Sequence, residues 1–180
     1  VGPYGAVLAD GSEYTGDYPA PGDSVAGLRA FHRPRLELLA DAGADVLACE
    51  TIPSLAEVEA LLAELESLAV PAWLSLTTVT TPDGRVLTRR GEDAGEAFAM
   101  AAGASSVIAV GVNCTAPEGV SAAVRVAARR SGKPVVVYPN SGETWDGPKR
   151  TWIGRPGLDA VDADTWVGDG TRLVGGCCRI

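Results

Sequence analysis

The chain has 180 residues, of which 46% are hydrophobic, and its formal net charge is −8 at pH 7. This size suits one domain over residues 1–180, and the acidic balance without clustered Lys and Arg argues against a nucleic-acid partner. The apolar runs are far shorter than the roughly 20 residues of a membrane span, and the first residues lack a secretory signal, so we expect a soluble, cytoplasmic protein with no membrane partner.

Three elements are predicted in the first 49 residues. Val1–Pro3 has the character of the end of a strand, and Asp45–Cys49 reads as a complete strand. Between them a helix is predicted over Asp23–Ala42. Pro34 must kink or restart this helix, because proline lacks a backbone donor and its ring clashes with the preceding turn. Gly43 stands where a left-handed C-cap would end it.

A helix and a strand are predicted between residues 54 and 77. Ser54 and Glu57 have the S-x-x-E spacing of a capping box at the start of a helix over Ser54–Leu68. The apolar side chains of this helix recur with helical spacing and should pack on a sheet: Leu55, Val58, Leu61, Leu62 and Leu65. The strand is predicted over Ala72–Thr77.

The second half of the chain continues the alternation. Thr80–Glu92 is polar and rich in Arg, which indicates a surface loop rather than a site. Helices are predicted over Glu92–Ala102 and Pro117–Arg130, the second with Pro at its first position. Gly103 and Gly132 stand at positions suited to left-handed C-caps. The remaining predicted strands are Ser106–Val112, Pro134–Tyr138 and Arg172–Gly175.

This alternation predicts an α/β fold of parallel strands linked by crossover helices. No G-x-G-x-x-G fingerprint follows any strand, and polar residues gather at the carboxyl ends of strands, where (β/α)8 TIM barrels build their sites. Those residues are Glu50, Thr78, Asn113, Cys114, Asn140, Cys177 and Cys178. A TIM barrel is therefore favoured. Five or six strands cannot close it, so the chain is expected to cover roughly strands 3 to 8 and to be incomplete at both ends.

Three of the four cysteines suggest a metal site. Adjacent Cys177 and Cys178 can hardly bridge each other, which argues against a disulfide framework. Together with Cys114 they follow two strands that could lie close together and supply three sulfur ligands. Sulfur favours zinc, and three protein ligands leave a fourth position open. The alternative is that they are small buried apolar side chains. We interpret Cys49 and His32 as structural residues.

Several segments are similar to the homocysteine S-methyltransferase family: VGPYGAVLADGSEYTGDY, FHRPRLELLADAGADVLACETIPSLAEVEAL, PAWLSLT, GVNCTAP, VVVYPNSGETWD and VGGCC. The resemblance spans nearly the whole chain and points to the branch that uses S-methylmethionine or S-adenosylmethionine. It implies a zinc-containing barrel in which Cys114, Cys177 and Cys178 are the ligands and the substrate thiol takes the fourth place.

The resemblance also implies substrate-binding residues. Glu50 matches the family position that contacts the amino group of L-homocysteine; the alternative is a solvated acid in a loop. Asn113 and Asn140 could bind substrate, hold the metal loops or serve in turns. Trp145 and Trp152 could form one wall of a donor pocket, because aromatic faces attract sulfonium cations, or could simply pack.

The predicted activity is zinc-dependent transfer of a methyl group from a sulfonium donor to the thiolate of L-homocysteine, which gives methionine. The family's first strands supply an acidic residue and other substrate contacts, and no residue here matches them. Three alternatives stay open. The chain could be the homocysteine-binding module of a cobalamin-dependent methionine synthase, its zinc could have a purely structural role, or it could be a non-catalytic remnant of the barrel.

Overall fold

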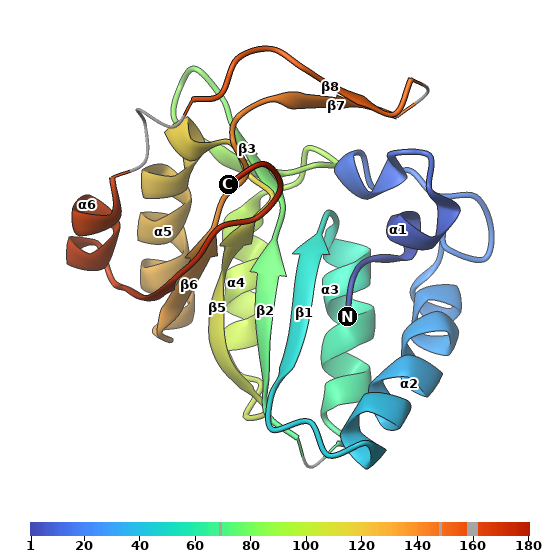
Figure 1. Ribbon diagram of the computed structural model, residues 1–180. Coiled ribbons are helices and arrows are strands. Elements are labelled where there is room, and N and C mark those ends of the chain that lie inside the picture. The colour runs from blue at the N-terminus through green and yellow to red at the C-terminus, as the bar shows by residue number, and fades with distance from the viewer. Residues whose placement is uncertain (69, 148, 158–161) are drawn as a thin grey trace.

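The computed structural model describes residues 1–68, 70–147, 149–157 and 162–180. Its centre is a five-stranded parallel sheet with the strand order β1-β2-β5-β6-β9 (Figure 1). The strands are β1 Leu47–Ile52, β2 Ala72–Leu76, β5 Val107–Asn113, β6 Val135–Tyr138 and β9 Thr171–Val174. All five complete strands predicted from the sequence are confirmed, with small shifts at their ends.

Helices connect the successive strands, as parallel pairing requires. They are α3 Leu55–Leu65, α4 Ala94–Ala102, α5 Pro117–Ser131 and α6 Ala163–Gly168, whereas α1 Tyr4–Leu8, the 3₁₀ turn η1 Ser12–Tyr14 and α2 Val25–Asp41 come before β1. Figure 1 shows α3 and α4 behind the sheet, with α5 beside them. No helix in the described part of the chain has the length and apolar character to cross a membrane.

Two short antiparallel hairpins were not predicted. The first pairs β3 Thr78–Thr80 with β4 Val86–Thr88, and the second pairs β7 Thr144–Asp146 with β8 Thr151–Ile153. Figure 1 shows the second hairpin above the carboxyl ends of the sheet strands. The hairpins therefore belong to the end of the sheet where the predicted site residues gather.

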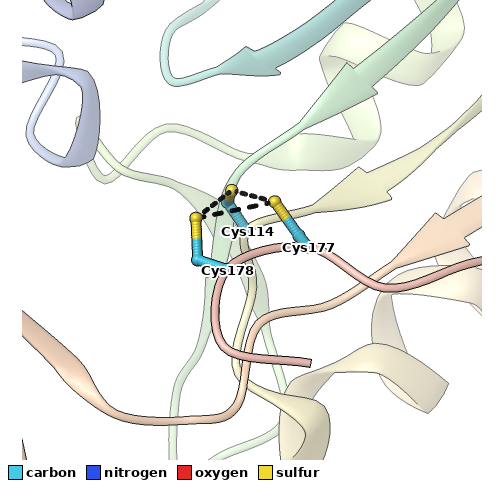
Figure 2. A group of neighbouring side chains, drawn as sticks. All are labelled: Cys114, Cys177 and Cys178. Atoms are coloured by element: carbon cyan, nitrogen blue, oxygen red, sulfur yellow. Dashed lines mark hydrogen bonds between the residues drawn. The ribbon is translucent and has the colours of Figure 1, made fainter.

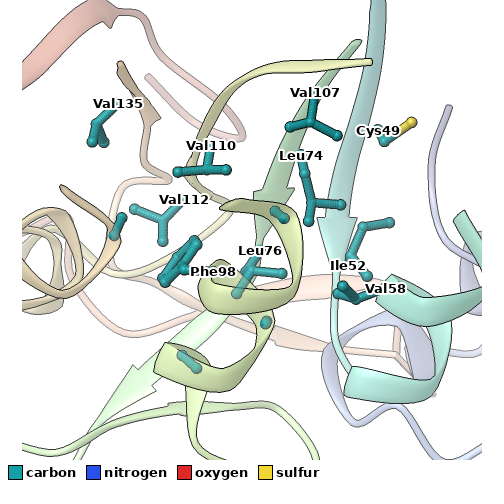
Figure 3. Close-up of a cluster of buried hydrophobic side chains, with 14 of the residues drawn as sticks. Cys49, Ile52, Val58, Leu74, Leu76, Phe98, Val107, Val110, Val112 and Val135 are labelled. Carbon is teal, nitrogen blue, oxygen red and sulfur yellow. The ribbon is translucent and has the colours of Figure 1, made fainter. Parts of the chain in front are cut away.

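The main core lies between the sheet and the helices (Figure 3). Strand residues such as Leu74, Val110 and Val112 belong to the same core as Phe98 of α4, and all four side chains are buried. The apolar stripe predicted on α3 also packs here. Cys49 is fully buried in the same core, where burial raises the pKa of its thiol to about 12. Its environment is that of a structural residue.

Three local expectations about helix ends and breaks meet different outcomes. Gly43 and Gly132 have φ values of 85° and 66°, as predicted for left-handed residues after helices. The left-handed C-cap at Gly103 is wrong, because its φ is −80° and the next amide, of Ala104, continues a right-handed turn by donating to Ala101. Of the two outcomes predicted at Pro34, the restart does not occur, because α2 is one helix that includes this residue, and the kink stays a prediction.

The predicted capping box is half correct. The Ser54 hydroxyl accepts a hydrogen bond from the Glu57 amide at 3.3 Å, but the Glu57 carboxylate does not complete the box. It instead accepts from the Tyr4 amide at 2.7 Å and the Tyr18 hydroxyl at 2.9 Å, and lies 2.8 Å from His32 Nε2. These long-range partners compete with the local cap, and they give buried His32 a structural contact between α2 and α3.

The predicted parallel α/β class is confirmed, but the described strands form an open sheet with β1 and β9 at its edges. Five strands are too few to curl into a closed eight-stranded barrel. Val1–Pro3 is not a strand. Even so, the Val1 amino group donates to the Ala48 carbonyl at 2.6 Å, and the Val1 carbonyl accepts from the Glu50 amide at 3.1 Å. The first residue thus lies along β1 as the end of a neighbouring parallel strand would.

Candidate metal and substrate site

The predicted cysteines converge because parallel strands end at one edge of the sheet. Cys114 directly follows β5, whereas Cys177 and Cys178 follow β9 after two glycines. The loop after β9 stays attached to the end of β6, since the Gly175 amide donates to Val137 and the Cys177 amide donates to Pro139, both at 2.8 Å. These hydrogen bonds place Cys177 and Cys178 beside Cys114, whose own amide donates to Tyr138 at the end of β6.

Figure 2 shows the three sulfur atoms turned toward one another. The Sγ–Sγ distances are 2.7 Å for Cys114–Cys177, 4.0 Å for Cys114–Cys178 and 3.9 Å for Cys177–Cys178, and all three thiols are free. Tetrahedral zinc with bonds of about 2.3 Å separates its sulfur ligands by roughly 3.8 Å. Two pairs already have this spacing, and the third needs to open by about 1 Å. The predicted convergence is confirmed, and the cluster could hold a metal ion.

The thiols perturb one another's acidity. Hydrogen bonding from the Cys114 thiol lowers the pKa of Cys177 to about 6, and the same bond, with burial, raises the pKa of Cys114 above its usual range. Burial chiefly raises the pKa of Cys178. A soft cation held by the three sulfur atoms would favour their deprotonated forms, because thiolates and not thiols bind metal ions.

Left-handed backbone occurs beside the site at residues other than glycine. Thr51, Cys114 and Arg179 have φ values of 61°, 46° and 71°. This conformation is unfavourable for L residues and especially for β-branched Thr51. The Asn113 amide holds Thr51 there: its Oδ1 accepts from the Thr51 amide and its Nδ2 donates to Thr51 Oγ1, each at 2.7 Å. Buried Asn113 thus has the contacts of a loop-holding residue, and its predicted substrate contact stays a prediction.

Glu50 precedes this strained turn. It is half-buried, and alternation along β1 puts its side chain on the sheet face opposite the buried Cys49. Its charge adds to burial in raising the pKa of the Tyr138 hydroxyl, which accepts a hydrogen bond from Trp73 Nε1 at 3.0 Å. The Glu50 carboxylate therefore lies near the carboxyl end of β6. Backbone carbonyls at this end of β6 also accept hydrogen bonds from the amides of Cys114 and Cys177.

A cavity of about 150 Å³ lies near Cys114, because its lining residue Arg89 donates to the Cys114 carbonyl. Its lining includes Tyr14, Arg89, Asn140, Glu143, Trp145 and Trp152. Trp145 and Trp152 face each other across the β7–β8 hairpin with ring centroids 5.3 Å apart. Asn140 is buried, and its Oδ1 accepts from the Gly142 amide at 2.9 Å. The two tryptophans and Asn140 are thus brought together, while Glu50 is not among the lining residues.

Tyr14, Arg89 and Glu143 were missed by the sequence reasoning. Burial first, and then the charges of Cys114 and Cys178, raise the pKa of the Tyr14 hydroxyl above its usual range, so this phenol lies beside the sulfur atoms. The buried Glu143 carboxylate is paired with Arg179, whose Nε donates to it at 3.0 Å. Both residues therefore belong to the surroundings of the cluster.

The interpretation of Thr80–Glu92 as a surface loop away from the site is wrong at Arg89. The β3–β4 hairpin returns the chain to the end of β2, where Arg89 Nε donates to Thr77 Oγ1 at 3.1 Å and Nη2 donates to the Cys114 carbonyl at 3.5 Å. A signal was present in the sequence: Pro82-Asp83-Gly84 is a turn pattern between two Thr- and Val-containing runs, typical of a hairpin.

Known proteins are similar to this chain in both sequence and fold. The homocysteine S-methyltransferase family model matches residues 1–180. The chain is similar to a homocysteine S-methyltransferase of Escherichia coli (strain K12), with 48% identity over 99% of the chain and 57% of the relative. It is 45% identical to homocysteine S-methyltransferase 3 of Arabidopsis thaliana over 99% of the chain and 52% of the relative. The crystal structure of the homocysteine methyltransferase MmuM from Escherichia coli in its metallated form has a TM-score of 0.78 and 42% identity, covering 100% of this chain and 55% of that one. The chain therefore spans about half the length of the relatives it matches.

Proposed function

The chain belongs to the homocysteine S-methyltransferase family, and we propose on this premise that the protein containing it transfers a methyl group from a sulfonium donor to L-homocysteine. With S-methylmethionine, one S–CH₃ bond of the donor breaks and its electron pair stays on the departing methionine sulfur. The new S–CH₃ bond forms on the homocysteine sulfur, and the thiol proton passes to solvent. The observation that carries the proposal is the convergence of Cys114, Cys177 and Cys178 at one edge of the sheet.

These three cysteines would hold a zinc ion. Their sulfur donors suit zinc, and two of the three sulfur–sulfur distances already match a tetrahedral site. When bound, the ion would stabilise the thiolate of a substrate thiol near neutral pH at the open fourth position. No general base is required from this chain, because the thiol has already lost its proton when methyl transfer begins.

The remaining residues would orient the two substrates. Glu50 would accept hydrogen bonds from the ammonium group of homocysteine, and its half-buried position near the end of β1 supports this role. Asn113 would hold the adjoining Thr51 turn, and Asn140 would contact substrate from the cavity wall. The faces of Trp145 and Trp152 would line the donor side of the cavity, where aromatic rings attract a sulfonium group.

The complete protein would form a (β/α)8 barrel, of which this chain supplies roughly strands 3 to 8. The sequential order of the parallel strands supports this architecture. So does the exposure of apolar strand residues, since Ile108, Leu173 and Val174 are 47%, 53% and 48% exposed. Further strands would cover such surfaces and pair with the free edges of the sheet.

The proposal is tested by following methyl transfer from isotopically labelled S-methylmethionine to homocysteine in the full-length protein. We expect turnover that requires homocysteine and is abolished by Cys178→Ser. Cys49→Ala, a change in a buried cysteine outside the cluster, should leave zinc content unchanged and the methyl-transfer reaction intact. A Cys178→Ser protein with wild-type turnover would remove the cluster from the reaction.

A further inference from the structure

Arg89 is a half-buried cation without an acidic partner in the described ranges. The ion pairs formed by arginine there involve Arg29, Arg33, Arg85, Arg90, Arg125 and Arg179. Arg89 instead donates through Nε and Nη2 to the neutral oxygens of Thr77 and Cys114. Its guanidinium lies 5.7 Å from the centre of the Tyr14 ring. Burial lowers the pKa of Arg89, and the nearby Tyr14 and Cys114 side chains offset part of this effect.

These contacts fix the guanidinium and leave part of it available. A guanidinium has five N–H donors in a planar fork, and the two bonds above leave the Nη1 edge uncommitted within the described residues. Arg89 lines the cavity together with Trp145 and Trp152. A planar fork of donors, already held in place, is the arrangement that proteins use to bind a carboxylate.

We propose that Arg89 binds the carboxylate of the methyl donor, and so restricts the cavity to sulfonium compounds that carry a carboxylate. This inference rests on the proposed function for its ligand. A bare sulfonium cation would be repelled by Arg89, even though the indole rings attract it. In an amino-acid sulfonium, four bonds separate the carboxylate carbon from the sulfur. Such a molecule can place its carboxylate on Arg89 and its sulfonium among the aromatic rings.

The donor is a better occupant than homocysteine, which also carries a carboxylate. Homocysteine has no sulfonium, so its thiol gains nothing from the cation-attracting faces of Trp145 and Trp152. The residue proposed for its ammonium group, Glu50, does not line this cavity. The two substrates would therefore approach the sulfur cluster from different sides, as transfer between them requires.

The test compares S-methylmethionine with its methyl ester, which lacks the carboxylate charge, in the zinc-loaded full-length protein. Binding is followed by tryptophan fluorescence, because Trp145 and Trp152 line the cavity, so the readout does not depend on turnover. We expect the ester to bind wild-type protein about 10- to 100-fold more weakly. Arg89→Gln should weaken S-methylmethionine binding by the same factor, and the ester should then suffer no further loss.

Arg90→Gln is the matched control, because Arg90 is the exposed neighbour of Arg89 and its Nε lies 3.8 Å from Asp17 Oδ1. This substitution should change the affinity neither for S-methylmethionine nor for its methyl ester. Equal binding of ester and S-methylmethionine to wild-type protein overturns the proposal without any variant. A loss on esterification that persists in Arg89→Gln, or a rise in the KM for homocysteine alone, also overturns it. The affinity difference between S-methylmethionine and its ester could depend on Arg89 in a protein that transfers no methyl group. That result would support the carboxylate site and contradict the proposed function.

Discussion

Replacing Asn113 with alanine removes both hydrogen bonds that hold Thr51 in the left-handed region. Each bond is 2.7 Å long, and Asn113 is 1% exposed, so water cannot easily replace the lost partner. Net losses of about 0.5–1.5 kcal/mol per bond give roughly 1–3 kcal/mol. Strain released as Thr51 leaves φ 61° offsets part of this. We therefore expect the free energy of unfolding to fall by about 2 kcal/mol.

Urea unfolding of the full-length protein measures this loss, and a Thr51→Gly background provides the control. Glycine adopts the left-handed conformation without help, so Asn113→Ala should cost less in that background. The same cost in both backgrounds would show that Asn113 acts through other contacts. An unchanged unfolding midpoint with a raised KM for homocysteine would refute the loop-holding role and favour direct substrate contact.

Three other predictions concern separate parts of the molecule. Glu50→Gln should raise the KM for homocysteine about 10- to 100-fold at unchanged zinc content, since it removes a charge-assisted contact; an unchanged KM in steady-state assays excludes Glu50 from the site. Residues 1–180 expressed alone should aggregate or stay partly unfolded and show no methyl transfer, and restoring the flanking segments should rescue both; a monodisperse, active 180-residue protein contradicts this. Hydrogen bonding from Arg33 lowers the pKa of Glu64, so this pair stabilises the fold above the unfolded pKa of about 4.3 and loses that effect as pH falls through the lower folded value. Arg33→Ala should therefore lower the urea unfolding midpoint slightly at pH 7 and leave it unchanged below the folded pKa of Glu64, a difference that urea titrations at several pH values will reveal.

The sheet and the cysteine cluster were predictable because their determinants are local. The five strands are short apolar runs that follow helices or turns, and parallel strands of successive crossovers end at one edge. Residues such as Cys114 and Cys177 were therefore placed together by topology alone. The short elements α1 and α6 have five and six residues, too few for a helical repeat to be recognised.

Other features depend on partners distant in the sequence. Glu57 has the spacing of a capping box, but Tyr4, Tyr18 and His32 supply its actual contacts from up to 53 residues away. Arg89 resembles a surface residue until the β3–β4 hairpin turns it toward Cys114. The polar, Arg-rich composition of the segment Thr80–Glu92 indicated exposure to solvent, whereas the geometry of the hairpin determines where the Arg89 side chain lies. The closed barrel was inferred from strand-end polarity, which the open sheet of the described residues also satisfies.

The central claim is that three cysteine sulfurs bind a zinc ion and leave one position for the substrate thiol. X-ray absorption at the zinc edge of the full-length protein counts sulfur neighbours directly. We predict three sulfur atoms and one lighter atom at the zinc without substrate, and four sulfur atoms at about 2.3 Å after homocysteine is added. A sulfur count that does not change on addition of homocysteine, or fewer than three sulfur atoms in its absence, would contradict the account.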